Sequence, residues 1–166
     1  MRFALLTVLV WLLTIPLSQA NCWRKITPLH STCDDVKKVL SIEACSMPTT
    51  NYNQPELQVM ISFASGDCDK TPRGWRVPKG TVTAIILSPK IPMTPATFGL
   101  DLSKYEKRED GEIVGLDHYT SVDEGVTVDI YNGVIHNLFL YPRKADEVLR
   151  CKPPDKTEAR PDGDRR

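Results

Sequence analysis

The fold of this chain is decided by one stretch, VTVDIYNGVIHNLFLY, which spans residues 126–141. Apolar and polar side chains alternate on both sides of Asn132-Gly133, and a period of two predicts half-buried β-strands. Asn-Gly between two such runs predicts a tight hairpin, because both residues accept the positive φ of a type I′ turn. The stretch therefore predicts strands at 126–131 and 134–141 joined by a two-residue turn.

Alternation elsewhere predicts three more strands, at 56–63, 81–88 and 113–121. Ser31 is placed to N-cap one short helix that ends at Leu40, and residues 101–107 predict a further helical turn. The expected fold class is α+β: an antiparallel β meander of about five strands with one or two short helices on one face.

Two parts of the chain are similar to each other. Residues 59–66 followed by 82–90 resemble residues 126–133 followed by 134–142, because each part has a strand, a turn that ends in Gly, and a strand that ends in Leu-x-Pro. The similarity predicts a degenerate duplication. The alternative is that any two hairpins look alike at this level.

Both ends of the chain differ from the part between them. Residues 1–20 have an apolar run after Arg2 and end in Ser18-Gln19-Ala20, which predicts a signal peptide cleaved after Ala20. The run is shorter than the roughly 20 residues of a membrane-spanning helix, and Cys22 leaves a lipid anchor as the alternative. Residues 152–166 have no large apolar side chain, which predicts a disordered tail. A single α+β domain is expected over residues 22–151.

Charge and motifs exclude several function classes. The 166 residues carry 21 Lys and Arg against 21 Asp and Glu, so the charge balance favours no nucleic-acid partner. The sequence has no nucleophile elbow, no phosphate-binding loop, no zinc-protease motif and no dinucleotide fingerprint. We therefore expect no catalytic residue, no cofactor and no metal site.

Five cysteines behind an export signal predict disulfides. Their spacing contains no Cys-x-x-Cys pair, which argues against a zinc site or a thioredoxin-like motif. Because five is odd, at least one thiol is free or pairs with another molecule. Spacing alone does not choose the pairs. We favour Cys45 with Cys68, because that bridge would tie the segment after the helix to the long loop after the first strand.

A row of ionisable side chains follows from the expected register. Counting back from the hairpin turn sets Asp129 opposite His136, and counting across the loop at 122–125 sets His118 opposite Asp129. With Tyr131, these residues form a predicted binding surface on the open face of the sheet. A bulge at 123–125 would move His118 to the other face. The opposite, buried face is expected to carry Val126, Val128, Ile130, Ile135 and Phe139.

This row allows more than one chemistry. Two imidazoles beside a carboxylate could bind a divalent metal, prime a histidine as a base, or switch a partner interface near the pH where histidine titrates. The alternative is a solvated charge ladder that only helps to fix the register, because a flat sheet gives no pocket that excludes water.

Two resemblances to known proteins add to this. The run from Ser31 to Leu40 (STCDDVKKVL) and the run from Gly125 to Ile135 (GVTVDIYNGVI) resemble the small envelope modules of the SmpA/OmlA type, which share a helix-plus-meander fold with the tandem β-lactamase-inhibitor proteins. That resemblance covers residues 26–141 and implies a binding module whose open sheet face meets another protein. The motifs PLHST (28–32), WRVP (75–78) and LRC (149–151) are similar to those of secreted bacterial proteins of unknown function.

The expected function is a secreted or periplasmic, non-catalytic protein-binding module of the inhibitor or envelope-assembly type. Its expected partner is another envelope or secreted protein, and the mature chain is expected to have no transmembrane segment. The alternative is a small secreted metal-binding protein or hydrolase that uses His118, Asp129 and His136.

Overall fold

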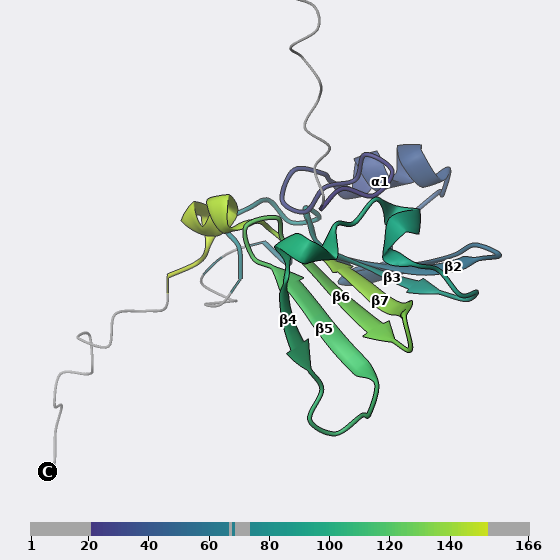
Figure 1. Ribbon diagram of the computed structural model, residues 1–166. Coiled ribbons are helices and arrows are strands. Elements are labelled where there is room, and N and C mark those ends of the chain that lie inside the picture. Colours follow the sequence, from purple (N-terminus) through teal and green to yellow (C-terminus); the bar gives the residue numbers. More distant parts are fainter. Residues whose placement is uncertain (1–20, 67, 69–73, 153–166) are drawn as a thin grey trace, which may run out of the picture.

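The computed structural model describes residues 21–66, 68 and 74–152, so the predicted signal peptide at 1–20 and the predicted tail after Lys152 lie outside the described residues. Seven antiparallel strands form one sheet in the order β1-β2-β3-β7-β6-β5-β4 (Figure 1). The strands are β1 (Thr49–Asn53), β2 (Leu57–Phe63), β3 (Val82–Pro89), β4 (Glu106–Glu109), β5 (Leu116–Ser121), β6 (Val126–Tyr131) and β7 (Val134–Leu140). The helical elements are α1 (Cys33–Leu40) and the 3₁₀ turns η1 (Pro95–Phe98), η2 (Leu102–Lys104) and η3 (Lys144–Leu149).

The antiparallel sheet is confirmed, but the expected number of about five strands is wrong. The two additional strands, β1 and β4, form the two edges of the sheet. Each pairs with one neighbour only and carries few apolar side chains, so neither shows the alternation that marks the inner strands. The expected helical turn at 101–107 divides into η2 and the start of β4.

Helix α1 begins one residue later than expected. Its N-cap is Thr32, whose hydroxyl accepts the backbone N–H of Asp35, while the Asp35 carboxylate accepts the backbone N–H of Thr32 at 2.8 Å. Ser31 is instead buried, and its hydroxyl accepts the backbone N–H of Thr27. The capping box fixes the start of α1, and Val36 and Leu40 of this helix are buried in the core.

Two three-stranded meanders make up most of the sheet. β1-β2-β3 and β7-β6-β5 meet through their last strands, where Ile86 of β3 lies opposite Phe139 of β7. The two hairpins with similar sequences, β2–β3 and β6–β7, are therefore neighbours on either side of the central β3–β7 pairing.

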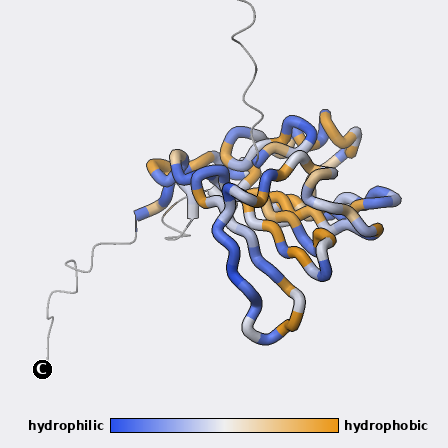
Figure 2. The backbone as a smooth tube through the Cα atoms, in the orientation of Figure 1, coloured by the Kyte–Doolittle hydropathy of each residue, from blue (hydrophilic) through white to orange (hydrophobic). Residues whose placement is uncertain are grey.

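One face of the sheet is covered. The N-terminal segment with Trp23 and Ile26, helix α1 and Tyr105 pack on it, and in Figure 1 the helix lies above the strands. Figure 2 shows hydrophobic residues gathered in the central strands beneath that layer. The buried strand residues are Leu57, Val59, Ile61, Phe63, Val82, Ile85, Leu87, Val126, Val128, Ile130, Ile135, Leu138 and Leu140.

A β-bulge in β7 changes the expected register. Tyr131 pairs with Val134 and Ile130 with Ile135 as counted, but the next pair is Asp129 with Asn137, so His136 is the extra residue. The bulge turns both Ile135 and Leu138 toward the core. Phe139, expected on the buried face, therefore lies on the other face.

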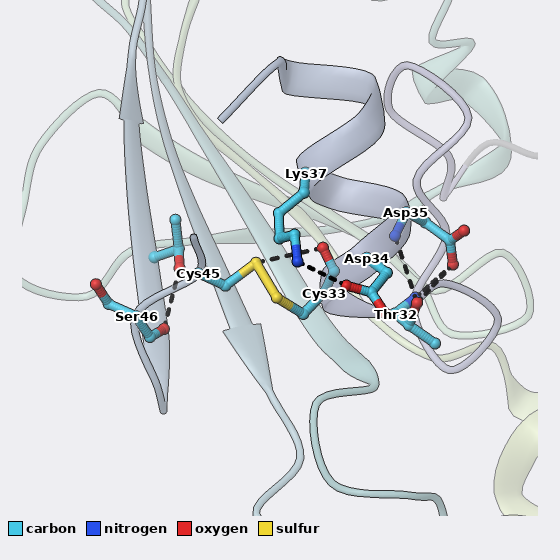
Figure 3. The surroundings of a disulfide bond; sticks show 8 residues. Thr32, Cys33, Asp34, Asp35, Lys37, Cys45 and Ser46 are labelled. Atoms are coloured by element: carbon cyan, nitrogen blue, oxygen red, sulfur yellow. Dashed lines mark hydrogen bonds and ion pairs between the residues drawn. A yellow bond between two sulfur atoms is a disulfide. The ribbon is translucent and has the colours of Figure 1, made fainter. Parts of the chain in front are cut away.

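The disulfides also differ from the expected pairing. Cys33 is bonded to Cys45 (Figure 3) and Cys68 to Cys151, so the predicted Cys45–Cys68 bridge is wrong. Both residues are bridged, but to other partners. The Cα atoms of the two bridges are 6.1 and 5.4 Å apart, and Cys22 is the free cysteine of the described chain.

No helix within the described residues is long and apolar enough to cross a membrane.

Candidate binding surface

On the second face of the sheet, paired residues of neighbouring strands form two rows that run across all seven strands. Each row contains one residue from every strand. We call the surface made by these two rows the open face. The first row is entirely polar: Asn53, Gln58, Ser88, Asn137, Asp129, His118 and Arg108. The second row is apolar in its centre and polar at its ends: Asn51, Met60, Ile86, Phe139, Thr127, Thr120 and Glu106.

No side chain of either row is buried in the described chain. Met60, Ile86 and Phe139 lie on the adjacent central strands β2, β3 and β7 and are each only half-buried. The ring of Tyr141 stacks on Phe139 with 6.0 Å between centroids. The open face therefore has an apolar centre with polar residues around it.

Two hollows lie on this side of the sheet. The first, of about 310 Å³, lies over β4, β5 and β6 and is lined by Glu106, Arg108, His118, Thr120 and Thr127. The second, of about 420 Å³, lies beside the second row, where β2 ends, β3 begins and β7 ends, and its lining includes Trp75, Ala84, Tyr141 and Arg150. The Arg150 guanidinium lies 3.9 Å from the centroid of the Trp75 ring. The apolar centre is thus close to two concave regions that each contain an arginine.

His118 is held between two carboxylates. Its Nδ1 lies 2.7 Å from Asp129 Oδ1, and its Nε2 lies 3.1 Å from Asp110 Oδ2. The hydrogen bonds to Asp110 and then to Asp129 raise the pKa of His118 above its usual value. In the doubly protonated ring, both nitrogens donate to a carboxylate.

Asp110 also organises the loop in which it lies. Its Oδ1 accepts the backbone N–H groups of Glu112 and Ile113 at 2.8 and 2.7 Å. Hydrogen bonds from His118 and from these two amides lower the pKa of Asp110 to about 2. This carboxylate therefore both shapes the 110–115 loop and ties it to β5.

The structure brings only part of the predicted row together. His118 lies opposite Asp129, as the register count predicts, and the two are hydrogen-bonded. His136 was expected opposite Asp129, and this is wrong, because the bulge in β7 places Asn137 there and leaves His136 exposed. Tyr131 lies at the exposed end of β6.

The sequence reasoning missed Asp110. No acidic residue of the 109–112 run is among the predicted site residues, yet Asp110 pairs with His118, the one histidine in the two rows. A signal was present, since an Asp followed by Gly often accepts backbone N–H groups two and three residues on.

The arrangement limits the chemistry that His118 can perform. While the ring is doubly protonated, both nitrogens donate to a carboxylate, so neither can accept a substrate proton or bind a metal ion. Within residues 21–66, 68 and 74–152, no three His, Cys, Asp or Glu side chains lie close enough together to hold one metal ion. In this arrangement His118 connects the 110–115 loop to β5 and β6.

Comparison of the chain with protein-family models, with curated proteins and with solved structures gives no match. The resemblance to SmpA/OmlA-type modules therefore stays a prediction.

Proposed function

We propose that this chain is a secreted or periplasmic, non-catalytic module that binds another protein on its open face. The observation that carries the proposal is the composition of that face: half-buried Met60, Ile86 and Phe139 in the centre and polar side chains at both ends of each row. Protein interfaces combine an apolar centre with a polar rim in this way.

The shape of the face supports the same proposal. An apolar centre flanked by two hollows offers a surface into which side chains of a partner fit. Arg108 and Arg150, one in each hollow, belong to the residue type that is enriched in interfaces. The inhibitor and the envelope-assembly roles both need such a surface, and the resemblance to SmpA/OmlA-type and β-lactamase-inhibitor folds suggests both.

The disulfides support the proposed location. Four of the five cysteines are bridged, and disulfides persist in oxidising compartments outside the cytosol. Together with the predicted signal peptide, they favour a secreted or periplasmic protein. We further propose that the β2–β3 and β6–β7 hairpins derive from a duplication, which the symmetric arrangement of the two meanders supports.

The experiment compares matched arginine variants as baits. Wild-type protein, Met60→Arg and the control Val148→Arg are immobilised and exposed to the secreted or envelope fraction of the producing cells. Val148 is 84% exposed on η3 and belongs neither to the two rows nor to the lining of either hollow. We expect at least one protein to bind the wild type and the control but not Met60→Arg. Equal binding to all three baits, with folding verified by circular dichroism, would exclude the open face as the docking surface.

A further inference from the structure

The 110–115 loop joins β4 to β5 and extends beyond the rest of the sheet (Figure 1). At its tip, Ile113 is 52% exposed and Val114 is 94% exposed. Figure 2 shows a hydrophobic stretch at the far end of the otherwise hydrophilic hairpin formed by β4 and β5. The loop therefore presents two apolar side chains at the margin of the open face.

The side chain of Asp110 connects this tip to the sheet. One oxygen accepts the amides of Glu112 and Ile113, and the other faces Nε2 of His118, which is anchored in turn to Asp129 on β6. The backbone closes the loop separately, through the Asp110 N–H to the Leu116 carbonyl at 2.9 Å. Loss of the side-chain connection would thus loosen the tip without opening the hairpin.

We propose that Asp110, His118 and Asp129 form a proton-controlled latch that fixes the 110–115 loop relative to the open face. The inference rests on the proposed function, because it concerns the regulation of that binding surface. With His118 protonated, the ring donates to both carboxylates and the latch is closed. With His118 neutral, only one N–H is left and the latch is open.

The geometry indicates which contact is lost. The Nδ1 contact to Asp129 is the shorter, at 2.7 Å against 3.1 Å for Nε2 to Asp110. Asp129 is also less exposed than Asp110, 14% against 24%. A buried carboxylate without a partner costs more than an exposed one, so the proton that is left stays on Nδ1. Deprotonation therefore releases Asp110 and, with it, the loop.

Other charged groups near His118 affect the pH of release. Arg108 lies directly opposite on β4, and Glu106 lines the same hollow. The positive charge of Arg108 opposes protonation, whereas the three carboxylates Glu106, Asp110 and Asp129 favour it. The hydrogen bonds to Asp110 and Asp129 have the largest effect and raise the pKa of His118. The latch consequently opens above the pH of about 6.5 at which an unperturbed histidine titrates.

The test is an NMR titration of the free protein from about pH 5 to about pH 9, a range that covers histidine titration. The exposed His136 is the internal reference. We expect the pKa of His118 to lie above the usual value for histidine. We also expect the hydrogen-exchange protection of the Glu112 and Ile113 amides, corrected for intrinsic exchange, to fall about fivefold, as loss of one typical hydrogen bond predicts. Constant protection as His118 titrates would overturn the proposal, as would a fall that follows His136 instead.

Two variants give matched controls. Asp110→Asn keeps an oxygen that can accept the two amides but removes the charge, so the pKa of His118 is expected to fall. His136→Gln should leave both the His118 titration and the loop protection unchanged. The titration and exchange measurements use the protein without a partner, so they are independent of the binding experiment with Met60→Arg. If loop protection does not follow the titration of His118, the latch is refuted but the proposed binding is not. If no partner binds, the proposed function is refuted but the titration can still be interpreted.

Discussion

Removing the Cys68–Cys151 disulfide is expected to destabilise the protein more than removing the Cys33–Cys45 disulfide. The first bridge closes 83 residues and the second closes 12. In the chain-entropy relation, a bridge stabilises by restricting the unfolded chain, by about 4.5 kcal/mol for the longer loop and about 2.8 kcal/mol for the shorter. The expected difference is about 1.7 kcal/mol.

Side-chain packing is also expected to make the loss of the Cys68–Cys151 disulfide the more destabilising of the two. Cys151 is buried, whereas Cys33 and Cys45 are partly exposed. Replacement of each pair by alanine therefore removes more buried contact at the longer bridge. The two loops do not overlap along the chain, so the losses should add when all four cysteines are replaced.

Urea unfolding of the two double-alanine variants measures these losses. The free energy of unfolding in water is compared with that of the wild type, and the m-value is expected to rise because an unbridged chain exposes more surface when it unfolds. Peptide mapping without reduction is the control for connectivity. Equal losses, or a larger loss for the Cys33–Cys45 pair, would refute the entropic argument, and a mapped Cys45–Cys68 bridge would refute the pairing itself.

Three further changes test other parts of the fold. Gly125→Ala should cost more than about 1 kcal/mol in urea unfolding, because the residue has φ +68° and the added Cβ would overlap the carbonyl oxygen of Tyr141; a neutral effect would contradict this. Thr32→Ala should lower stability by about 1 kcal/mol through loss of the helix cap that it forms with Asp35, whereas Thr32→Ser should preserve stability. Hydrogen bonding lowers the pKa of Asp110 from 3.8 to about 2, so this carboxylate stabilises the fold above about pH 4 and the contribution is lost as the pH falls toward 2; Asp110→Asn should flatten the pH dependence of the melting temperature in that range, and an unchanged slope would count against the contacts described.

Local sequence signals, alternation and turn motifs, predict the five inner strands but not the two edge strands. β6 begins and ends where alternation and Asn132-Gly133 place it, because those signals lie within a few residues of each other. The edge strand β4 (Glu106–Glu109) has four charged residues in succession. Its formation depends on pairing with β5, and charge on an edge strand discourages pairing with other chains.

The bulge in β7 shows how tertiary packing overrides a local count. Leu138 and Leu140 reach the core only if one residue is skipped after Ile135, and burial of both outweighs the loss of one regular pair. The same shift removed His136 from the predicted row. Contacts of this kind depend on the whole sheet, so residue spacing within one hairpin could not reveal them.

The candidate site could be predicted only where it depends on the regular pairing of neighbouring strands. His118 and Asp129 lie on neighbouring strands with a regular register, so counting placed them together. Asp110 reaches His118 because it directly follows β4, whose Arg108 pairs with His118, and no local sequence signal marks that edge strand. The cysteine pairing likewise depends on the path of the chain, which brings the loop after β2 next to the segment that follows η3.

Site-specific photo-crosslinking in the producing cells tests the central claim, protein binding on the open face, most directly. A photoreactive amino acid replaces Gln58, which is exposed in the first row of that face, and in a control replaces Lys38, which is exposed on α1 on the covered side. The account predicts a covalent adduct of defined mass from position 58 and none from position 38. No adduct from position 58, or the same adduct from both positions, would contradict it.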